Sequence, residues 1–314
     1  MRSLFALRPV AAVHRLPPRS EACPLSLRDV LRGLAGRARA LPVFVAPLPA
    51  VARAALVAAQ EARAVVGIAL AAGVAPEPWF DAVARAADEL APRLPFFASA
   101  EVVIEPGEGA LERAYAEAHR LVEAGVGHLA VDVAAVALPR RAQAAARVAG
   151  VASERELAVE CVLAPDAASE PAAAAAYLEE FEGWGVRADL VGVRCPAPAG
   201  RGEADRERAA LDALSEALAR PVLRRGPLGS DAAHAFTGGR LRVCEDGGAA
   251  LAAGWRALPP ELRGRGAGAR DRAPLEPASE RTEALAYAEA AALVEALGAG
   301  GTAPELLAAL GVRR

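Results

Sequence analysis

The chain has 314 residues, 54% of them hydrophobic, and a formal net charge of −3 from 36 basic and 39 acidic residues. This length exceeds a typical single domain, but closed α/β barrels commonly run to about 200–250 residues or more as one unit. The near balance of charge gives no general attraction to nucleic acid or anionic lipid. Lysine and asparagine are missing from the sequence, which excludes a Schiff base, an imine-anchored pyridoxal phosphate and a P-loop.

The cysteines and the N-terminus indicate the compartment. The four cysteines are Cys23, Cys161, Cys195 and Cys244. They are far apart and form no CxxC pair, so neither a disulfide framework nor a zinc knuckle is predicted. The apolar N-terminal stretch is broken by Arg8-Pro9, which is poor for a signal peptide. No uncharged apolar run reaches the roughly 18–20 residues that a membrane helix needs. We therefore expect a cytoplasmic protein with no membrane partner.

The predicted elements begin after a lead-in of residues 1–24, which is rich in Pro and Arg and is expected to be loose. Ser26-Leu-Arg-Asp29 is typical of a helix start, and this helix is expected to end at about Ala40. Short β-rich runs then alternate with helical segments rich in Ala, Leu, Arg and Glu. The runs end near Pro47, Leu70, Ile104, Val133, Leu163, Cys195, Arg224 and Asp246. The helical segments include Pro49–Arg63, Pro78–Leu90, Glu108–Ala124 and Ala204–Ala219.

Apolar strands that alternate with amphipathic helices predict a parallel sheet buried on both faces. Eight units favour closure into an α/β fold of the (β/α)8 TIM-barrel type over an open sheet, which would need its GxGxxG signature after the first strand. We assign residues 25–257 to the barrel and residues 258–280, rich in Pro, Gly and Arg, to a flexible linker. Residues 281–314 are predicted to form C-terminal helices. Their apolar stripe is expected to pack on the barrel, with a partner as the alternative.

The functional residues of such barrels lie at the carboxyl ends of the strands. Seven charged residues occupy these positions: Glu101, Asp132, Glu160, Arg194, Arg225, Glu245 and Asp246. The carboxylates suit acid–base catalysis or oxygen ligation of a divalent cation. We take Glu101, Asp132 and Glu160 as the candidate catalytic residues. Alternatively, the carboxylates pair with the two arginines and only close the top of the barrel.

The last two units carry an anion-binding pattern. Arg224-Arg-Gly-Pro-Leu-Gly229 and Cys244-Glu-Asp-Gly-Gly248 each precede a predicted helix. Glycine lets backbone N–H groups approach an anion, and phosphate sites of barrels recur after strands seven and eight. The predicted phosphate-binding residues are Arg225, Gly226, Gly229 and Gly247, with Arg225 as a charge-assisted fork. The alternative is that the glycines serve only the strand-to-helix turns.

Histidine and cysteine offer little further chemistry. The histidines are His14, His119, His128 and His234. They do not converge, and His128 starts the fourth strand at the end opposite to the mouth, so all four are predicted to be surface or packing residues. Catalysis by Ser-His-Asp or Cys-His is therefore not expected. The cysteines near strand ends are Cys161, Cys195 and Cys244. They are expected to be small buried hydrophobes, with a three-thiolate metal site as the alternative.

Several strand segments share their layout with a known family. The segments are Val126-Gly-His-Leu-Ala-Val-Asp132, Ala188-Asp-Leu-Val-Gly-Val-Arg-Cys, Pro221-Val-Leu-Arg-Arg-Gly and Leu241-Arg-Val-Cys-Glu-Asp246. In this order they resemble the fourth, sixth, seventh and eighth strands of the zinc-dependent class II aldolases that act on fructose or tagatose bisphosphate. The chain also resembles the non-catalytic subunit that accompanies some tagatose-bisphosphate aldolases. The resemblance covers about Leu27 to Trp255 and lies in spacing rather than in individual motifs.

The resemblance implies a sugar-phosphate site without the family's metal. Laid over the family pattern without gaps, the three zinc-binding histidines fall on Val102, Ala199 and Arg225, none of which is a normal zinc ligand. Zinc is therefore not expected, and no other cofactor is implied. The family's catalytic acid falls on Glu101, which keeps its carboxylate.

The phosphate grip of the family is largely kept. It matches Gly226, Gly229 and Asp246, so the resemblance adds Asp246 to the predicted phosphate-binding residues, while Cys244 replaces an asparagine. An oxygen-ligated metal at the three candidate catalytic carboxylates stays open as an alternative.

These observations lead to three hypotheses. The first is a class II aldolase-like barrel of carbohydrate metabolism that binds a small phosphorylated sugar or supports a partner aldolase, without zinc-dependent aldolase activity. The second is an active lyase or isomerase on a sugar phosphate, with Glu101 as acid or base and Arg225 as the anion anchor. The third is a structural protein that assembles, with a partner or with itself, through its C-terminal helices.

Overall fold

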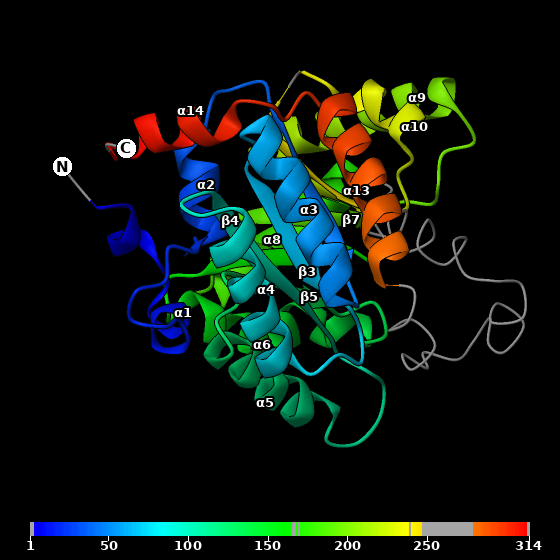
Figure 1. Cartoon of the computed structure of the whole chain (residues 1–314). Helices are drawn as coiled ribbons and strands as arrows, with labels where there is room; N and C mark the ends of the chain where they lie inside the picture. The colour runs from blue at the N-terminus through cyan, green and yellow to red at the C-terminus, as the bar shows by residue number, and fades with distance from the viewer. Residues whose placement is uncertain (1–2, 165–167, 169, 239, 247–278, 313–314) are drawn as a thin grey trace, which may run out of the picture.

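The computed structural model describes residues 3–164, 168, 170–238, 240–246 and 279–312. Gly247 of the predicted phosphate site and residues 258–278 of the predicted linker lie outside this part. Eight parallel strands close into a barrel surrounded by helices, so the predicted TIM-barrel fold is confirmed (Figure 1). The strands are β2 Ala40–Ala46, β3 Val66–Leu70, β4 Pro95–Val103, β5 His128–Asp132, β6 Ala158–Val162, β7 Leu190–Arg194, β8 Val222–Gly226 and β9 Arg242–Asp246. Pairing of β2 with β9 and of β4 with β5 completes the ring.

Helices follow the strands as the alternating pattern predicts. The longer ones that follow β2 to β7 are α3 Pro49–Ala62, α4 Pro76–Leu90, α5 Ala110–Glu123, α6 Arg141–Ser153, α8 Pro171–Gly183 and α9 Arg201–Leu218. Three of them start with proline in the first turn, where no intrahelical N–H partner is lost. The loop after β8 leads only into the single turn α10, Ser230–Ala233, and a short 3-10 turn, η3 His234–Phe236.

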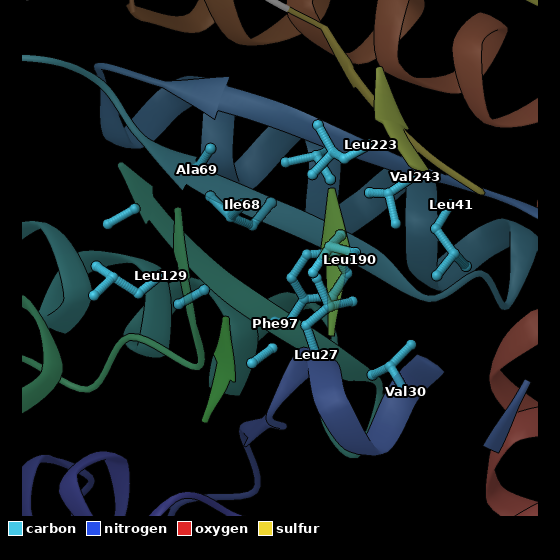
Figure 2. Packing of buried hydrophobic residues seen from close by; sticks show 14 of the residues in the cluster. Leu27, Val30, Leu41, Ile68, Ala69, Phe97, Leu129, Leu190, Leu223 and Val243 are labelled. Carbon is cyan, nitrogen blue, oxygen red and sulfur yellow. The ribbon is translucent and has the colours of Figure 1, made fainter. Parts of the chain in front are cut away.

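The amino-terminal end of the barrel is covered by α2, Leu27–Gly33. Ser26 caps this helix by accepting a hydrogen bond from the backbone N–H of Arg28, as the sequence predicts. The helix ends at Gly33, earlier than the expected Ala40, because the chain must already turn into β2. Leu27 of α2 belongs to the same buried cluster as Phe97 from the barrel interior (Figure 2). The apolar face of α2 therefore plugs the end of the barrel that lies opposite to the predicted site.

The lead-in of residues 1–24 is more ordered than expected. It contains a 3-10 turn, η1 Leu4–Leu7, a helix, α1 Val10–Arg15, and a two-residue strand, β1 Cys23–Pro24, that pairs with β4. The Arg15 guanidinium binds both carboxylate oxygens of Asp81 on α4, at 2.8 and 2.7 Å from Nη2. The expectation of a loose segment was wrong because these contacts to the barrel anchor it.

The C-terminal helices α13, Ser279–Ala296, and α14, Thr302–Ala309, pack on the barrel of their own chain. Helix α13 lies between α3 and α10 and so fills the place of the eighth outer helix (Figure 1). The ion pair between Arg53 and Glu283, at 3.3 Å, ties it to α3. Helix α14 packs against α2, where a Cβ on Gly33 would lie 2.5 Å from Cδ1 of Leu306. No helix in the described part of the chain is long and apolar enough to span a membrane.

Candidate functional site

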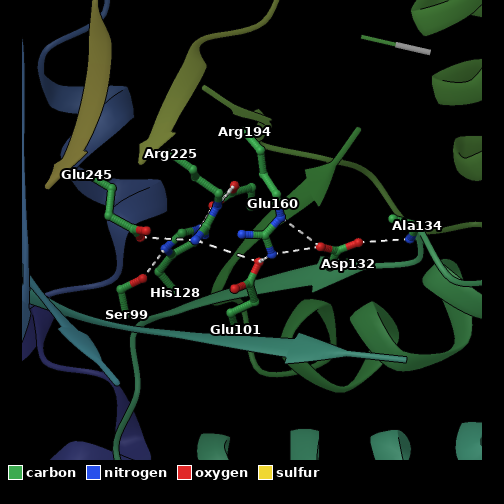
Figure 3. A network of polar contacts seen from close by, with 9 residues as sticks. All are labelled: Ser99, Glu101, His128, Asp132, Ala134, Glu160, Arg194, Arg225 and Glu245. Carbon is green, nitrogen blue, oxygen red and sulfur yellow. Dashed lines mark hydrogen bonds and ion pairs between the residues drawn. The ribbon is translucent and has the colours of Figure 1, made fainter. Parts of the chain in front are cut away.

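One polar network fills the carboxyl-terminal half of the barrel (Figure 3). It comprises Ser99, Glu101, His128, Asp132, Glu160, Arg194, Arg225 and Glu245. Six of the seven charged residues that we predicted at the strand ends are thus brought together. The seventh, Asp246, is buried at the end of β9, and successive strand residues point to opposite faces, so it faces away from Glu245 and the network.

The inner part of the network is centred on the Arg225 guanidinium. Its Nε and Nη2 donate to the two carboxylate oxygens of Glu160, at 2.6 and 2.7 Å, and its Nη1 donates to Glu245 at 3.0 Å. The side chains of Arg225 and Glu160 are 3% and 0% exposed. Glu160, which we placed at the mouth, therefore lies inside the barrel, and its pairing with Arg225 favours the charge-neutralising alternative for these two residues.

A glycine on the neighbouring strand makes room for this ion pair. A Cβ atom on Gly192 of β7 would lie 1.9 Å from Oε1 of Glu160 and 3.2 Å from Nε of Arg225. No side chain is compatible with the pair as it stands, since real Cβ atoms essentially never approach that closely. Gly192, Glu160 and Arg225 therefore form one fitted arrangement across β6, β7 and β8.

His128 is the residue that the sequence interpretation missed. It is fully buried, with Nδ1 at 2.8 Å from Oγ of Ser99 and Nε2 at 3.0 Å from Oε2 of Glu160. His128 is buried, as a packing residue would be, but it lies within the site and not away from it, as we had expected. The available signal was the period of two in a strand, because His128 lies four residues before Asp132 and therefore shares its inward face.

The outer part of the network is centred on Arg194 and is open to solvent. Its Nε and Nη2 donate to Oδ2 of Asp132, at 2.9 and 2.7 Å, and Nη2 also donates to Glu101 at 2.6 Å. The other oxygen of Asp132 accepts the backbone N–H of Ala134 at 2.8 Å. The side chain of Arg194 is 50% exposed and that of Glu101 is 24% exposed. These are the residues of the network that a ligand can reach.

The two buried carboxylates that contact Arg225 have pKa values shifted in opposite directions. Burial acts to raise the pKa of Glu160, but the charge and hydrogen bonds of Arg225, with those of His128, lower it to about 2. Burial raises the pKa of Glu245, and the single contact from Arg225 does not offset this. Burial opposes the charged form of Arg225, yet its carboxylate partners hold its pKa well above the ordinary range. Glu160 and Arg225 are therefore a permanent ion pair near neutral pH.

The lowered pKa of Glu160 predicts an acid-sensitive contribution to stability. A carboxyl group with a depressed folded-state pKa stabilises the fold above its ordinary value of 4.5, and this stabilisation is lost as the pH falls toward about 2. The shift corresponds to about 3 kcal/mol. We expect the difference in unfolding free energy between the wild type and Glu160→Gln to shrink by about this amount between pH 5 and pH 2. Urea unfolding at several pH values measures it, and a constant difference would contradict the assignment.

The predicted phosphate-binding residues differ in whether the fold itself already accounts for them. Arg225 is committed to Glu160 and Glu245. Gly226 has a φ of +134°, and a Cβ there would lie 2.0 Å from the carbonyl oxygen of Cys195, so the turn itself requires this glycine. A Cβ on Gly229 would meet no atom of the described chain within 4 Å. Gly229 is thus the one of the two described glycines that neither packing nor the turn explains.

The residues at the implied zinc positions do not fit a zinc ion. Val102 is buried and lies next to the inward-facing Glu101, so it points out of the barrel, while Ala199 lies in the exposed loop after β7. Arg225, at the third position, places a cation among the carboxylates. The alternative metal site with oxygen ligands also lacks available ligands, because Asp132 and Glu160 each have both carboxylate oxygens in hydrogen bonds. Among the described residues no group of three His, Cys, Asp or Glu has metal-binding geometry.

The three-thiolate alternative is also disfavoured by the surroundings of the cysteines. Burial is the largest effect on each thiol near a strand end and raises its pKa to about 12. These thiols are Cys161, Cys195 and Cys244. Cys161 and Cys244 are next to the inward-facing Glu160 and Glu245 on their strands, so both thiols point out of the barrel and away from the site. Cys161 and Cys244 are fully buried, as the interpretation as small buried side chains expects, whereas Cys195 is only partly buried.

Comparison with known proteins supports the fold. No family model and no curated protein sequence matches the chain. Among solved structures, the YdjI aldolase from Escherichia coli K12 is similar with a TM-score of 0.64 at 12% identity, over 88% of this chain and 98% of that one. A protein provisionally assigned as a fructose-1,6-biphosphate aldolase from Coccidioides immitis is similar with a TM-score of 0.54 at 14% identity, over 88% and 95%.

A third solved structure, provisionally assigned as a tagatose 6 phosphate kinase from Sinorhizobium meliloti 1021, is similar with a TM-score of 0.53 at 18% identity, over 87% of this chain and 88% of that one. One architecture thus carries the names of two different activities, an aldolase and a kinase. Similarity at these identities establishes the architecture, and the function has to be argued from the site. The chain is accordingly a TIM barrel, and most of its length has the same fold as the aldolase structures.

Proposed function

We propose that the protein is an aldolase-like TIM barrel that binds a small phosphorylated sugar at the carboxyl end of its strands, by itself or beside a catalytic aldolase subunit, and that it does not carry out zinc-dependent aldol cleavage. The observation that carries this proposal is the position of Arg225. Its guanidinium lies inside the barrel, within hydrogen-bonding distance of Glu160 and Glu245. A divalent cation at the same place would be repelled by a permanent positive charge.

Arg194 is a better anion anchor than Arg225. It is half exposed, and its Nη1 has no hydrogen-bond partner among the described residues, whereas all three nitrogens of Arg225 are occupied inside the barrel. Guanidinium groups bind phosphate by paired, charge-assisted hydrogen bonds. The hydroxyl groups of a sugar would find an acceptor in Glu101, next to the same guanidinium. Gly229, whose Cα is open, is the remaining candidate for backbone contact with the phosphate.

Titration calorimetry with fructose bisphosphate and tagatose bisphosphate tests the binding. We expect saturable binding that Arg194→Met weakens at least tenfold, since loss of a charge-assisted contact costs about 1.5–3 kcal/mol. Arg147→Met is the matched control, because Arg147 is 47% exposed and pairs with Glu112 at 2.8 Å on the outer helices. The same preparation should release no triose phosphate from either compound with zinc added. Zinc-dependent turnover, or binding that survives Arg194→Met, would contradict the proposal.

A second candidate is a metal-independent lyase or isomerase on a sugar phosphate. The observation in its favour is Glu101, which accepts one hydrogen bond at the mouth and is partly exposed, as a general acid or base must be. Consumption of a sugar phosphate in the presence of a chelator, abolished in Glu101→Gln with binding intact, would favour this function over pure binding.

A further inference from the structure

We infer that Arg194 masks Glu101 in the free protein and that an anion bound at Arg194 releases the Glu101 carboxylate into the site. The inference rests on the proposed anion site at the mouth of the barrel and describes how that site responds to its ligand. Arg194 then has two roles: it binds the anion, and by doing so it controls the position of Glu101.

Arg194 is shared unequally by its two carboxylates. It donates two hydrogen bonds to Asp132, at 2.9 and 2.7 Å, and one to Glu101, at 2.6 Å. Asp132 is also held by the N–H of Ala134 and is only 6% exposed, whereas Glu101 is four times more exposed. In the part of the chain that the structure describes, the nearest other cation to Glu101 is Nη1 of Arg225 at 3.8 Å, beyond hydrogen-bonding distance. Glu101 is therefore the partner that an incoming anion displaces.

The inner arginine cannot respond in the same way. Arg225 donates through three nitrogens to Glu160 and Glu245 within the barrel, and its ion pair with Glu160 is enclosed on one side by the backbone of Gly192. Breaking such a buried pair costs several kcal/mol, while a half-exposed pair is worth about 1 kcal/mol or less. An anion that enters from solvent therefore exchanges partners with Arg194 and leaves Arg225 in place.

The exchange couples anion recognition to the chemistry of Glu101. When Arg194 turns its Nη1 and Nη2 toward an anion, it can keep Asp132 through Nε, and Glu101 loses the one close donor that it has among the described residues. The freed carboxylate then lies beside the bound ligand, able to accept a hydroxyl hydrogen or a proton. A neutral sugar has no charge to offer Arg194 and would leave Glu101 paired. Glu101 therefore becomes available only when the ligand carries a negative charge.

Carbodiimide labelling with glycinamide, read out by peptide mass spectrometry, reports the availability of Glu101. Sulfate serves as the probe anion, compared with chloride at matched ionic strength and with neutral fructose. We expect sulfate to increase labelling of Glu101 several-fold, and chloride and fructose to leave it unchanged. Glu112, which pairs with Arg147 on the outer helices, is the internal control; it is 64% exposed and already open to the reagent, so sulfate should not change its labelling.

The variants separate this inference from the proposed function. In Arg194→Met, Glu101 should be labelled strongly without any anion and should not respond to sulfate, while Arg147→Met should behave as the wild type. If sulfate unmasks Glu101 but calorimetry detects no bisphosphate binding, the release stands and the proposed ligand is wrong. Labelling of Glu101 that does not change with sulfate, or that is as low in Arg194→Met as in the wild type, would overturn the inference.

Discussion

Replacing Arg225 by methionine is expected to lower the free energy of unfolding by about 3–5 kcal/mol, the usual cost of removing one partner from a buried ion pair. Methionine matches the aliphatic part of the arginine side chain but carries no charge, so Glu160 and Glu245 would be left buried without their cation. Urea unfolding followed by circular dichroism measures the loss. Arg147→Met, at an exposed pair, should stay within about 0.5 kcal/mol of the wild type.

A double variant identifies the cause of that loss. Combining Arg225→Met with Glu160→Gln removes both charges, so the double variant should be clearly more stable than the sum of the two single losses predicts. Groups that interact directly are not additive, and coupling of about 1–3 kcal/mol is expected. Strictly additive losses, or a loss below about 1 kcal/mol for Arg225→Met, would show that the ion pair does not hold the interior together.

Gly226→Ala is expected to be the second most damaging change, with a loss of about 3 kcal/mol. The φ of +134° disfavours any residue with a Cβ, and the new atom would lie 2.0 Å from the Cys195 carbonyl oxygen, which is backbone and cannot move aside cheaply. The comparison is Gly229→Ala, three residues further on. Gly229 has a φ of −68° and a ψ of 154°, which alanine adopts readily, so its stability should change by less than about 1 kcal/mol.

The same pair distinguishes the two interpretations of these glycines. If Gly229 contacts the phosphate, Gly229→Ala should weaken bisphosphate binding while the fold keeps its stability. Unfolding curves and calorimetry on the two variants therefore give opposite patterns. Equal losses of stability at both positions would show that both glycines serve only the turn.

The strands were predictable because each is buried on both faces of a parallel sheet. Such strands read as continuous apolar runs, and the predicted ends at Leu70 and Asp246 coincide with the ends of β3 and β9. The outer helices followed from the segments between these runs. The convergence of the charged residues also followed, because carboxyl ends of parallel strands meet at one end of a barrel.

The sequence could not show how deep each charged side chain lies in the barrel, or which side chains pair with one another. Glu160 is the third residue of β6, and whether it lies at the mouth or inside depends on the stagger of neighbouring strands, which single-strand patterns do not contain. The choice of Glu160, rather than Glu101, as the close partner of Arg225 depends on the space that Gly192 leaves. The place of α13 in the helix ring likewise depends on contacts with α3, more than 200 positions earlier.

The guanidinium at the centre of the barrel has a consequence for how the site is maintained. Its positive charge is part of the polypeptide, within hydrogen-bonding distance of the carboxylates that surround it. The cation therefore does not exchange with the medium, is not diluted away and cannot be extracted by a chelator. The interior acquires its electrical balance when the chain folds, and it loses that balance only when the chain unfolds.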